Sequence, residues 1–121
     1  MKIKIGNSVD LLFSIKDSSG VAVQNLSEAT AIKFMVKVNQ TDTDLEAKIS
    51  KTLIDGITID TPAVGNIKVI LTALNTMLTP GKYYVALQIE WATYIQEVNI
   101  KESGDELTEI NTITFAQDII R

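Results

Sequence analysis

Apolar and polar residues alternate along most of this chain with a period of two residues. Successive side chains of a β-strand point to opposite faces of a sheet, so this period indicates strands that have one buried face. In the clearest stretch the apolar set is Ile32, Phe34, Val36 and Val38, and the set facing the other way is Lys33, Met35, Lys37 and Asn39. No helical period extends beyond two turns. The pattern therefore excludes a fold built on long helices.

Further alternating segments are separated by clusters of Asp, Asn, Ser, Pro and Gly, the residues that favour turns. Strands are predicted over residues 9–16, 32–38, 45–50, 57–59, 67–71, 83–91, 94–101 and 113–119, with a short returning segment at 21–26 and a brief helical turn at 72–77. Short strands with frequent turns are typical of a β-sandwich. We therefore predict an all-β sandwich of seven or eight antiparallel strands that forms one domain over residues 1–121.

The charge balance is acidic, with 11 Lys and Arg residues against 15 Asp and Glu residues and a net charge of −4. Nucleic-acid binders usually carry a basic excess on one face. The longest apolar runs are far shorter than the ~20 residues of a membrane helix. The first twenty residues lack the apolar stretch of a signal peptide, because Asp10 interrupts it. We expect neither a nucleic-acid partner nor a membrane partner.

The chain contains no Cys and no His, which removes disulfides, thiol nucleophiles, the common acyl-transfer triads and most transition-metal sites. Gly-rich phosphate-binding motifs and the Ser–Lys nucleophile spacing are missing as well. Residues 42–46 resemble the start of a calcium loop, but Ala47 and Leu53 stand where Gly and a carboxylate are needed. A polar loop is the favoured interpretation there, and a weak surface calcium site is the alternative. We predict a non-enzymatic protein with no catalytic residue, no metal and no cofactor.

A Leu-x-Pro-Gly-x-Tyr step, formed by Leu78, Pro80, Gly81 and Tyr83, leads into the longest alternating strand. It resembles the tyrosine corner of immunoglobulin-like and fibronectin-like sandwiches, in which the tyrosine hydroxyl bonds to backbone a few residues upstream. Pro80 fixes φ, Gly81 permits a sharp bend, and Tyr83 can bury its ring while its hydroxyl stays hydrogen-bonded. This motif specifies architecture and says nothing of function.

Three aromatic residues of the same region suggest a second interpretation. Tyr84, Trp91 and Tyr94 could form a platform on which a sugar stacks, as in carbohydrate-binding sandwiches. Trp91, however, is in phase with Leu87 and Ile89, which favours a place in the core or at its edge. A carbohydrate-binding or adhesion module is therefore the alternative function, with a glycan as the alternative partner.

The order of motifs along the chain resembles the immunoglobulin-like domains of tailed-phage structural proteins, especially the N-terminal domain of siphophage baseplate upper proteins. The resemblance rests on Gly6, residues 17–20, 23–26, 32–38, 56–59, 65–69 and 71–73, the step from Thr76 to Tyr83, and residues 114–119. It implies a structural module of a phage or prophage particle, associated with the tail or baseplate, that contacts other phage structural proteins or copies of itself. It also implies a virion protein made in the bacterial cytoplasm without a signal peptide. Baseplate upper proteins continue into a trimerising region that holds the receptor-binding module, whereas this sequence ends at Arg121, so that role is not carried over.

Residues on the outward phase of the predicted strands 32–38 and 83–91 are candidates for the contact surface. They are Lys33, Met35, Lys37 and Tyr84. Sheet edges are a second candidate, because an edge strand offers unpaired N–H and C=O groups to a partner. An ordinary solvated surface is the alternative for each of these side chains.

Overall fold

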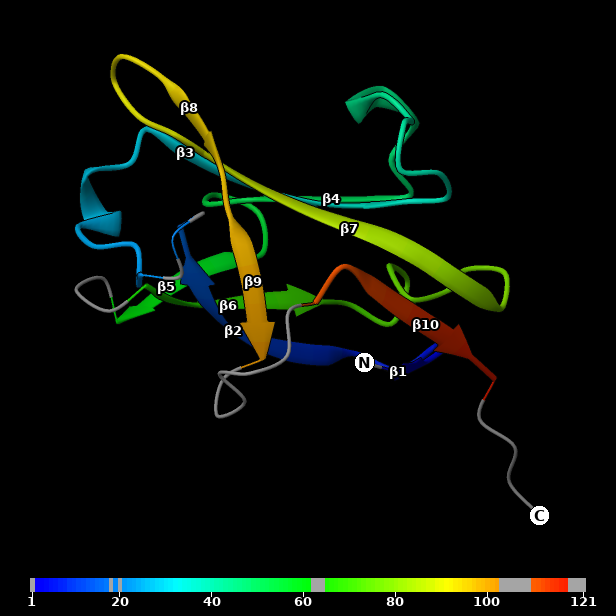
Figure 1. Cartoon of the computed structure of the whole chain (residues 1–121). Coiled ribbons are helices and arrows are strands. Elements are labelled where there is room, and N and C mark those ends of the chain that lie inside the picture. The colour runs from blue at the N-terminus through cyan, green and yellow to red at the C-terminus, as the bar shows by residue number, and fades with distance from the viewer. Residues whose placement is uncertain (1, 18, 20, 62–64, 103–109, 118–121) are drawn as a thin grey trace.

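The computed structural model describes residues 2–17, 19, 21–61, 65–102 and 110–117, and these fold into two β-sheets (Figure 1). The strands are β1 (Lys2–Lys4), β2 (Val9–Lys16), β3 (Ala31–Lys37), β4 (Ile49–Thr52), β5 (Ile57–Thr61), β6 (Asn66–Leu71), β7 (Gly81–Glu90), β8 (Ile95–Glu97), β9 (Asn99–Glu102) and β10 (Thr112–Ala116). Two short 3₁₀ helices, η1 (Leu26–Glu28) and η2 (Asp44–Glu46), lie in the loops. The predicted all-β, two-sheet architecture is confirmed. No described helix is long and apolar enough to cross a membrane.

Sheet A has the strand order β1-β10-β7-β3-β4, with β8 also paired to β7, and sheet B has the order β5-β6-β2-β9. Every pairing between these strands is antiparallel except that of β1 with β10, which is parallel. The described residues thus form ten strands, two of which pair in parallel, where the sequence predicts seven or eight antiparallel ones. Three-residue β1 was missed because alternation over so short a segment gives little signal.

Both sheets direct apolar side chains into one shared core. Phe13 of β2 and Phe34 of β3 are fully buried and stack across the interface between the sheets, with ring centroids 5.7 Å apart. Tyr83 of β7 meets Phe115 of β10 edge to face at 5.3 Å. Aromatic pairs of this kind contribute about 0.5–1.5 kcal/mol beyond the apolar area that they bury.

One polar side chain breaks the alternation without an energetic penalty. Ser14 lies between the buried Phe13 and Ile15 and is itself only 4% exposed. Its hydroxyl donates a hydrogen bond to Asn66 Oδ1 of the neighbouring strand at 3.1 Å. Because the buried group has a partner, it does not carry the desolvation cost of an unsatisfied one.

The strand predicted over residues 45–50 is wrong in its first half. Helix η2 occupies this segment, and Leu45 is 99% exposed. Glu46 Oε1 accepts hydrogen bonds from the backbone N–H and the hydroxyl of Thr43, both at 2.9 Å. This Thr-x-x-Glu contact is the capping arrangement that favours a helical turn over an extended chain. The strand begins only at Ile49.

The hairpin partner predicted over residues 94–101 is correct only for its first part. β8 pairs with β7, and Val98 N–H still donates to Leu87 O at 3.3 Å, but β9 pairs with β2 in the other sheet. β8 and β10 pair with the same side of β7. β8 pairs with the last residues of β7, and β10 pairs with its first residues, up to Tyr84. With no room left beside β7, the chain leaves sheet A at Val98 and joins sheet B.

We expect Gly65→Ala to destabilise the fold strongly. Gly65 has φ +73°, and an added Cβ would lie 2.8 Å from the carbonyl oxygens of Ile15 and Val23, which belong to the backbone and cannot rotate away. Positive φ costs a residue with a side chain about 1–2 kcal/mol, and the overlap adds about 1–3 kcal/mol. Urea unfolding followed by circular dichroism should show a loss of about 3 kcal/mol.

Gly81→Ala is the matched control for this experiment. Gly81 also has a positive φ, +152°, but an added Cβ would have no atom within 4 Å. The control should lose only the conformational part, about 1–2 kcal/mol. Equal losses in the two variants would contradict the steric argument.

Candidate functional site

The four residues predicted as a contact surface lie on one face of the sheet. In the pairing of β3 with β7, Lys37 stands opposite Tyr84, Met35 opposite Ala86 and Lys33 opposite Gln88. The neighbouring Tyr83 points into the core, so Tyr84 points outward. We call this surface the sheet A face and define it by Lys33, Met35, Lys37, Tyr84, Ala86, Gln88 and Glu90.

Met35 does not offer the exposed contact that its outward phase suggests. It is only 3% exposed, although its side chain lies outside the main core cluster. β3 is an inner strand, so β4 and β7 flank Met35 with Ser50 and Ala86. The thioether lines two shallow hollows of about 270 and 220 Å³, one on each side. Met35 therefore forms an apolar floor between half-exposed neighbours.

Both lysines of the sheet A face are held by local partners. Lys33 Nζ lies 3.1 Å from Glu90 Oε1, and Lys37 Nζ donates a hydrogen bond to the carbonyl oxygen of Asp42 at 3.0 Å. A pair as exposed as Lys33 and Glu90 adds at most about 1 kcal/mol to stability. Its larger effect is to fix the position of two long side chains on the face.

Tyr83 closes the corner before β7. Its hydroxyl donates a hydrogen bond to the carbonyl oxygen of Thr79 at 2.6 Å, and its ring is 7% exposed. Leu78 is half-buried against the core, whereas Pro80 and Gly81 are exposed at the bend. The contact sets where β7 begins, and therefore which of its side chains reach the sheet A face.

The tip of the β7–β8 hairpin carries a pair of aromatic rings. Trp91 and Tyr94 stack with centroids 6.3 Å apart and an interplanar angle of 29°. Trp91 N–H donates to Tyr94 O at 2.8 Å, and the indole Nε1–H donates to Gln96 Oε1 at 3.0 Å. Tyr84 is not part of this cluster, because it lies seven residues away along an extended strand, about 23 Å. The predicted three-residue aromatic platform is wrong in that respect.

A groove of about 430 Å³ is lined by residues of this hairpin and of the chain that leads into η1. These two segments lie at the same end of the sandwich (Figure 1). We call this groove the hairpin groove. It is lined by Asp17, Ala22, Val23, Gln24, Asn25, Glu28, Trp91, Tyr94 and Gln96. Sequence reasoning missed Gln24, Asn25 and Glu28, which lie in a non-periodic segment. Asn25 precedes η1, but its backbone is left-handed and its side chain makes no capping hydrogen bond, so no capping signal in the sequence marks this turn.

Two acidic residues of the predicted polar loop accept hydrogen bonds from nearby backbone N–H groups. Asp42 Oδ2 accepts a hydrogen bond from Asn39 N–H at 3.0 Å, and Glu46 Oε1 accepts one from Thr43 N–H. Within the part of the chain that the structure describes, no three Asp or Glu side chains gather where a metal ion could bind.

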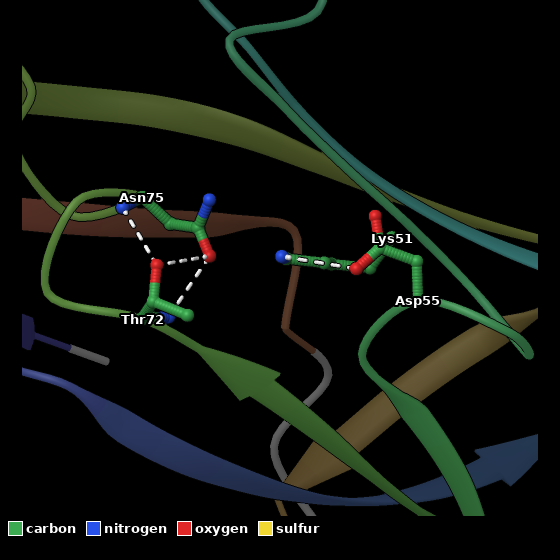
Figure 2. A network of polar contacts seen from close by, with 4 residues as sticks. All are labelled: Lys51, Asp55, Thr72 and Asn75. Atoms are coloured by element: carbon green, nitrogen blue, oxygen red, sulfur yellow. Dashed lines mark hydrogen bonds and ion pairs between the residues drawn. The ribbon is translucent and has the colours of Figure 1, made fainter.

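Two polar pairs, Lys51 with Asp55 and Thr72 with Asn75, close turns of the chain (Figure 2). Lys51, only 6% exposed, extends its ammonium to 3.9 Å from Asp55 Oδ1. Thr72 donates through its N–H and its hydroxyl to Asn75 Oδ1, at 2.8 and 2.9 Å. Each pair bridges residues three or four apart, so both stabilise local turns.

Comparison with protein-family models and with curated proteins finds no match to this chain. The geometry of the sheet A face and of the hairpin groove therefore carries the argument on function.

We expect Tyr83→Phe to lower the free energy of unfolding by about 1–2 kcal/mol, because the Thr79 carbonyl loses its donor while the ring stays in place. Tyr84→Phe is the matched control, since the structure gives the Tyr84 hydroxyl no hydrogen bond within the described residues. Thermal and urea unfolding of both variants would measure this difference. Equal stabilities would show that the corner contact contributes nothing.

Proposed function

We propose that this chain is an immunoglobulin-like β-sandwich that serves as a non-enzymatic structural module of a bacteriophage or prophage particle, associated with the tail or baseplate. It acts through protein–protein contacts with other particle proteins or with copies of itself. The sheet A face is the contact surface.

The strand order supports the immunoglobulin-like part of the proposal. The run β10-β7-β3-β4 corresponds to strands G, F, C and C′ of a variable-type domain, and β5-β6-β2 corresponds to D, E and B. The tyrosine that bonds upstream backbone lies at the start of β7, which is strand F in this correspondence, as in a tyrosine corner. β9 takes the place beside β2 that the first strand often occupies in such domains.

The observation that carries the functional part is the composition and fixed geometry of the sheet A face. Tyr84 provides a half-exposed aromatic ring, and residues of this type are enriched among those that dominate binding energy. Lys33 and Lys37 are already held by Glu90 and the Asp42 carbonyl, so a partner orders few additional side chains. The hollows on both sides of Met35 offer apolar depressions that a partner side chain can fill.

The genomic setting and a binding experiment test the two parts of this proposal separately. We expect genes for tail components on either side of the gene for this chain. The tagged protein should then co-purify with the product of a flanking gene when the two are co-expressed. A locus with no phage gene would refute the particle assignment.

Tyr84→Ala should weaken this complex at least tenfold, a loss of about 1.4 kcal/mol in binding free energy, measured by biolayer interferometry. Tyr94→Ala is the control, because it removes an aromatic ring from the hairpin groove and leaves the sheet A face intact. If Tyr94→Ala weakens the complex and Tyr84→Ala does not, the contact surface is not the sheet A face. If the chain binds copies of itself, sedimentation velocity should show that Tyr84→Ala weakens this self-association and that Tyr94→Ala does not.

A further inference from the structure

We propose that the hairpin groove is a binding site for a neutral pyranose sugar. This site lies at the tip of β7–β8, just beyond the Glu90 end of the sheet A face, and does not depend on the function proposed above.

The exposed ring of Tyr94 provides the stacking surface. One side of the ring faces Trp91, and the side chain as a whole is 58% exposed, which leaves ring surface open to a ligand. The C–H groups on one side of a pyranose ring form an apolar patch. An aromatic face carries negative quadrupolar charge and attracts such C–H groups while both surfaces leave water.

The aromatic pair is already fixed in position. Trp91 packs against the core with one part of its ring, while its indole N–H is held by Gln96 and its backbone N–H by Tyr94. A sugar therefore binds without having to order the rings, and the entropic cost of binding is reduced.

Side chains opposite the rings provide unused hydrogen-bonding groups. Within the described part of the chain, the side chains of Gln24, Asn25 and Glu28 have no hydrogen-bond partner. An amide both donates and accepts, as a sugar hydroxyl does, so two amides and one carboxylate match a polyhydroxylated ring. The backbone of Asn25 is left-handed, with φ 58°, which turns the chain sharply at the edge of the groove.

The charge of the lining selects among sugars. Asp17 and Glu28 line the groove, and among the residues that the structure describes no Lys or Arg does. Acidic sugars and phosphate-bearing polymers are repelled by this lining and find no cation to pair with. A cationic ligand would use only the rings and Glu28, whereas a neutral sugar would also hydrogen-bond to the amides of Gln24 and Asn25, so a neutral sugar makes more contacts.

Trp91 allows a direct test, because it is the only Trp in the chain and its side chain lines the groove. The purified chain would be titrated with the methyl glycosides of glucose, galactose, mannose and N-acetylglucosamine at millimolar concentrations. At least one should saturate a change in Trp fluorescence and shift the single indole N–H resonance in NMR spectra. Methyl glucuronide should give no saturable response.

Tyr94→Ala should weaken binding at least tenfold, and Gln24→Ala should weaken it several-fold by removing one hydrogen-bonding amide. Tyr84→Ala should leave it unchanged. Both groove residues are exposed, so both variants are expected to keep the wild-type circular-dichroism spectrum. Saturation by tetramethylammonium but by no glycoside would overturn the proposal in favour of a cation site. Failure of all four glycosides would overturn it outright, and it would leave the experiment on Tyr84 and the protein partner untouched.

Discussion

The contact between Phe13 and Phe34 joins the two sheets at their inner strands, and the rest of the fold depends on it. The chain has no Cys, so no disulfide joins the sheets, and the shared apolar core around these rings holds them against each other. β2 and β3 each have a neighbour on both sides, so the stacked rings lie where both sheets are most completely paired. Because the inner side of β3 is fixed in this way, its outer side presents Lys33 and Lys37 at constant spacing.

The sequence was most informative where one strand buries one face. The alternation of β3 and β7 identified both strands and placed Lys33, Lys37 and Tyr84 on a common surface. It misassigned two residues, because Met35 on the outward phase is buried and Val38 on the inward phase is exposed. It failed where a local hydrogen bond competed with the period, as Glu46 and Thr43 do at η2. It failed again at Val98, because a period of two residues indicates a buried face and does not say which sheet the strand joins.

The two candidate surfaces differ in how far sequence reasoning could reach them. The sheet A face follows from the phase of two strands, and only the burial of Met35 needed knowledge of the cross-strand neighbours. The hairpin groove combines residues 17–28 with residues 91–96, which lie far apart in the chain. The polar residues opposite the rings follow no period, and Trp91 is in phase with the core. Only the tertiary structure brings these two segments together.

The parallel pairing of β1 with β10 has a mechanical consequence. These are the first and last described strands, they run in the same direction, and their register joins Lys2 to Thr114 and Lys4 to Ala116. Tension applied along the chain pulls the two strands in opposite directions along their own axes. The hydrogen bonds between them are therefore loaded in shear and must fail together, whereas bonds opened like a zipper fail one at a time. A domain built in this way resists extension through its ends more than its small size alone suggests.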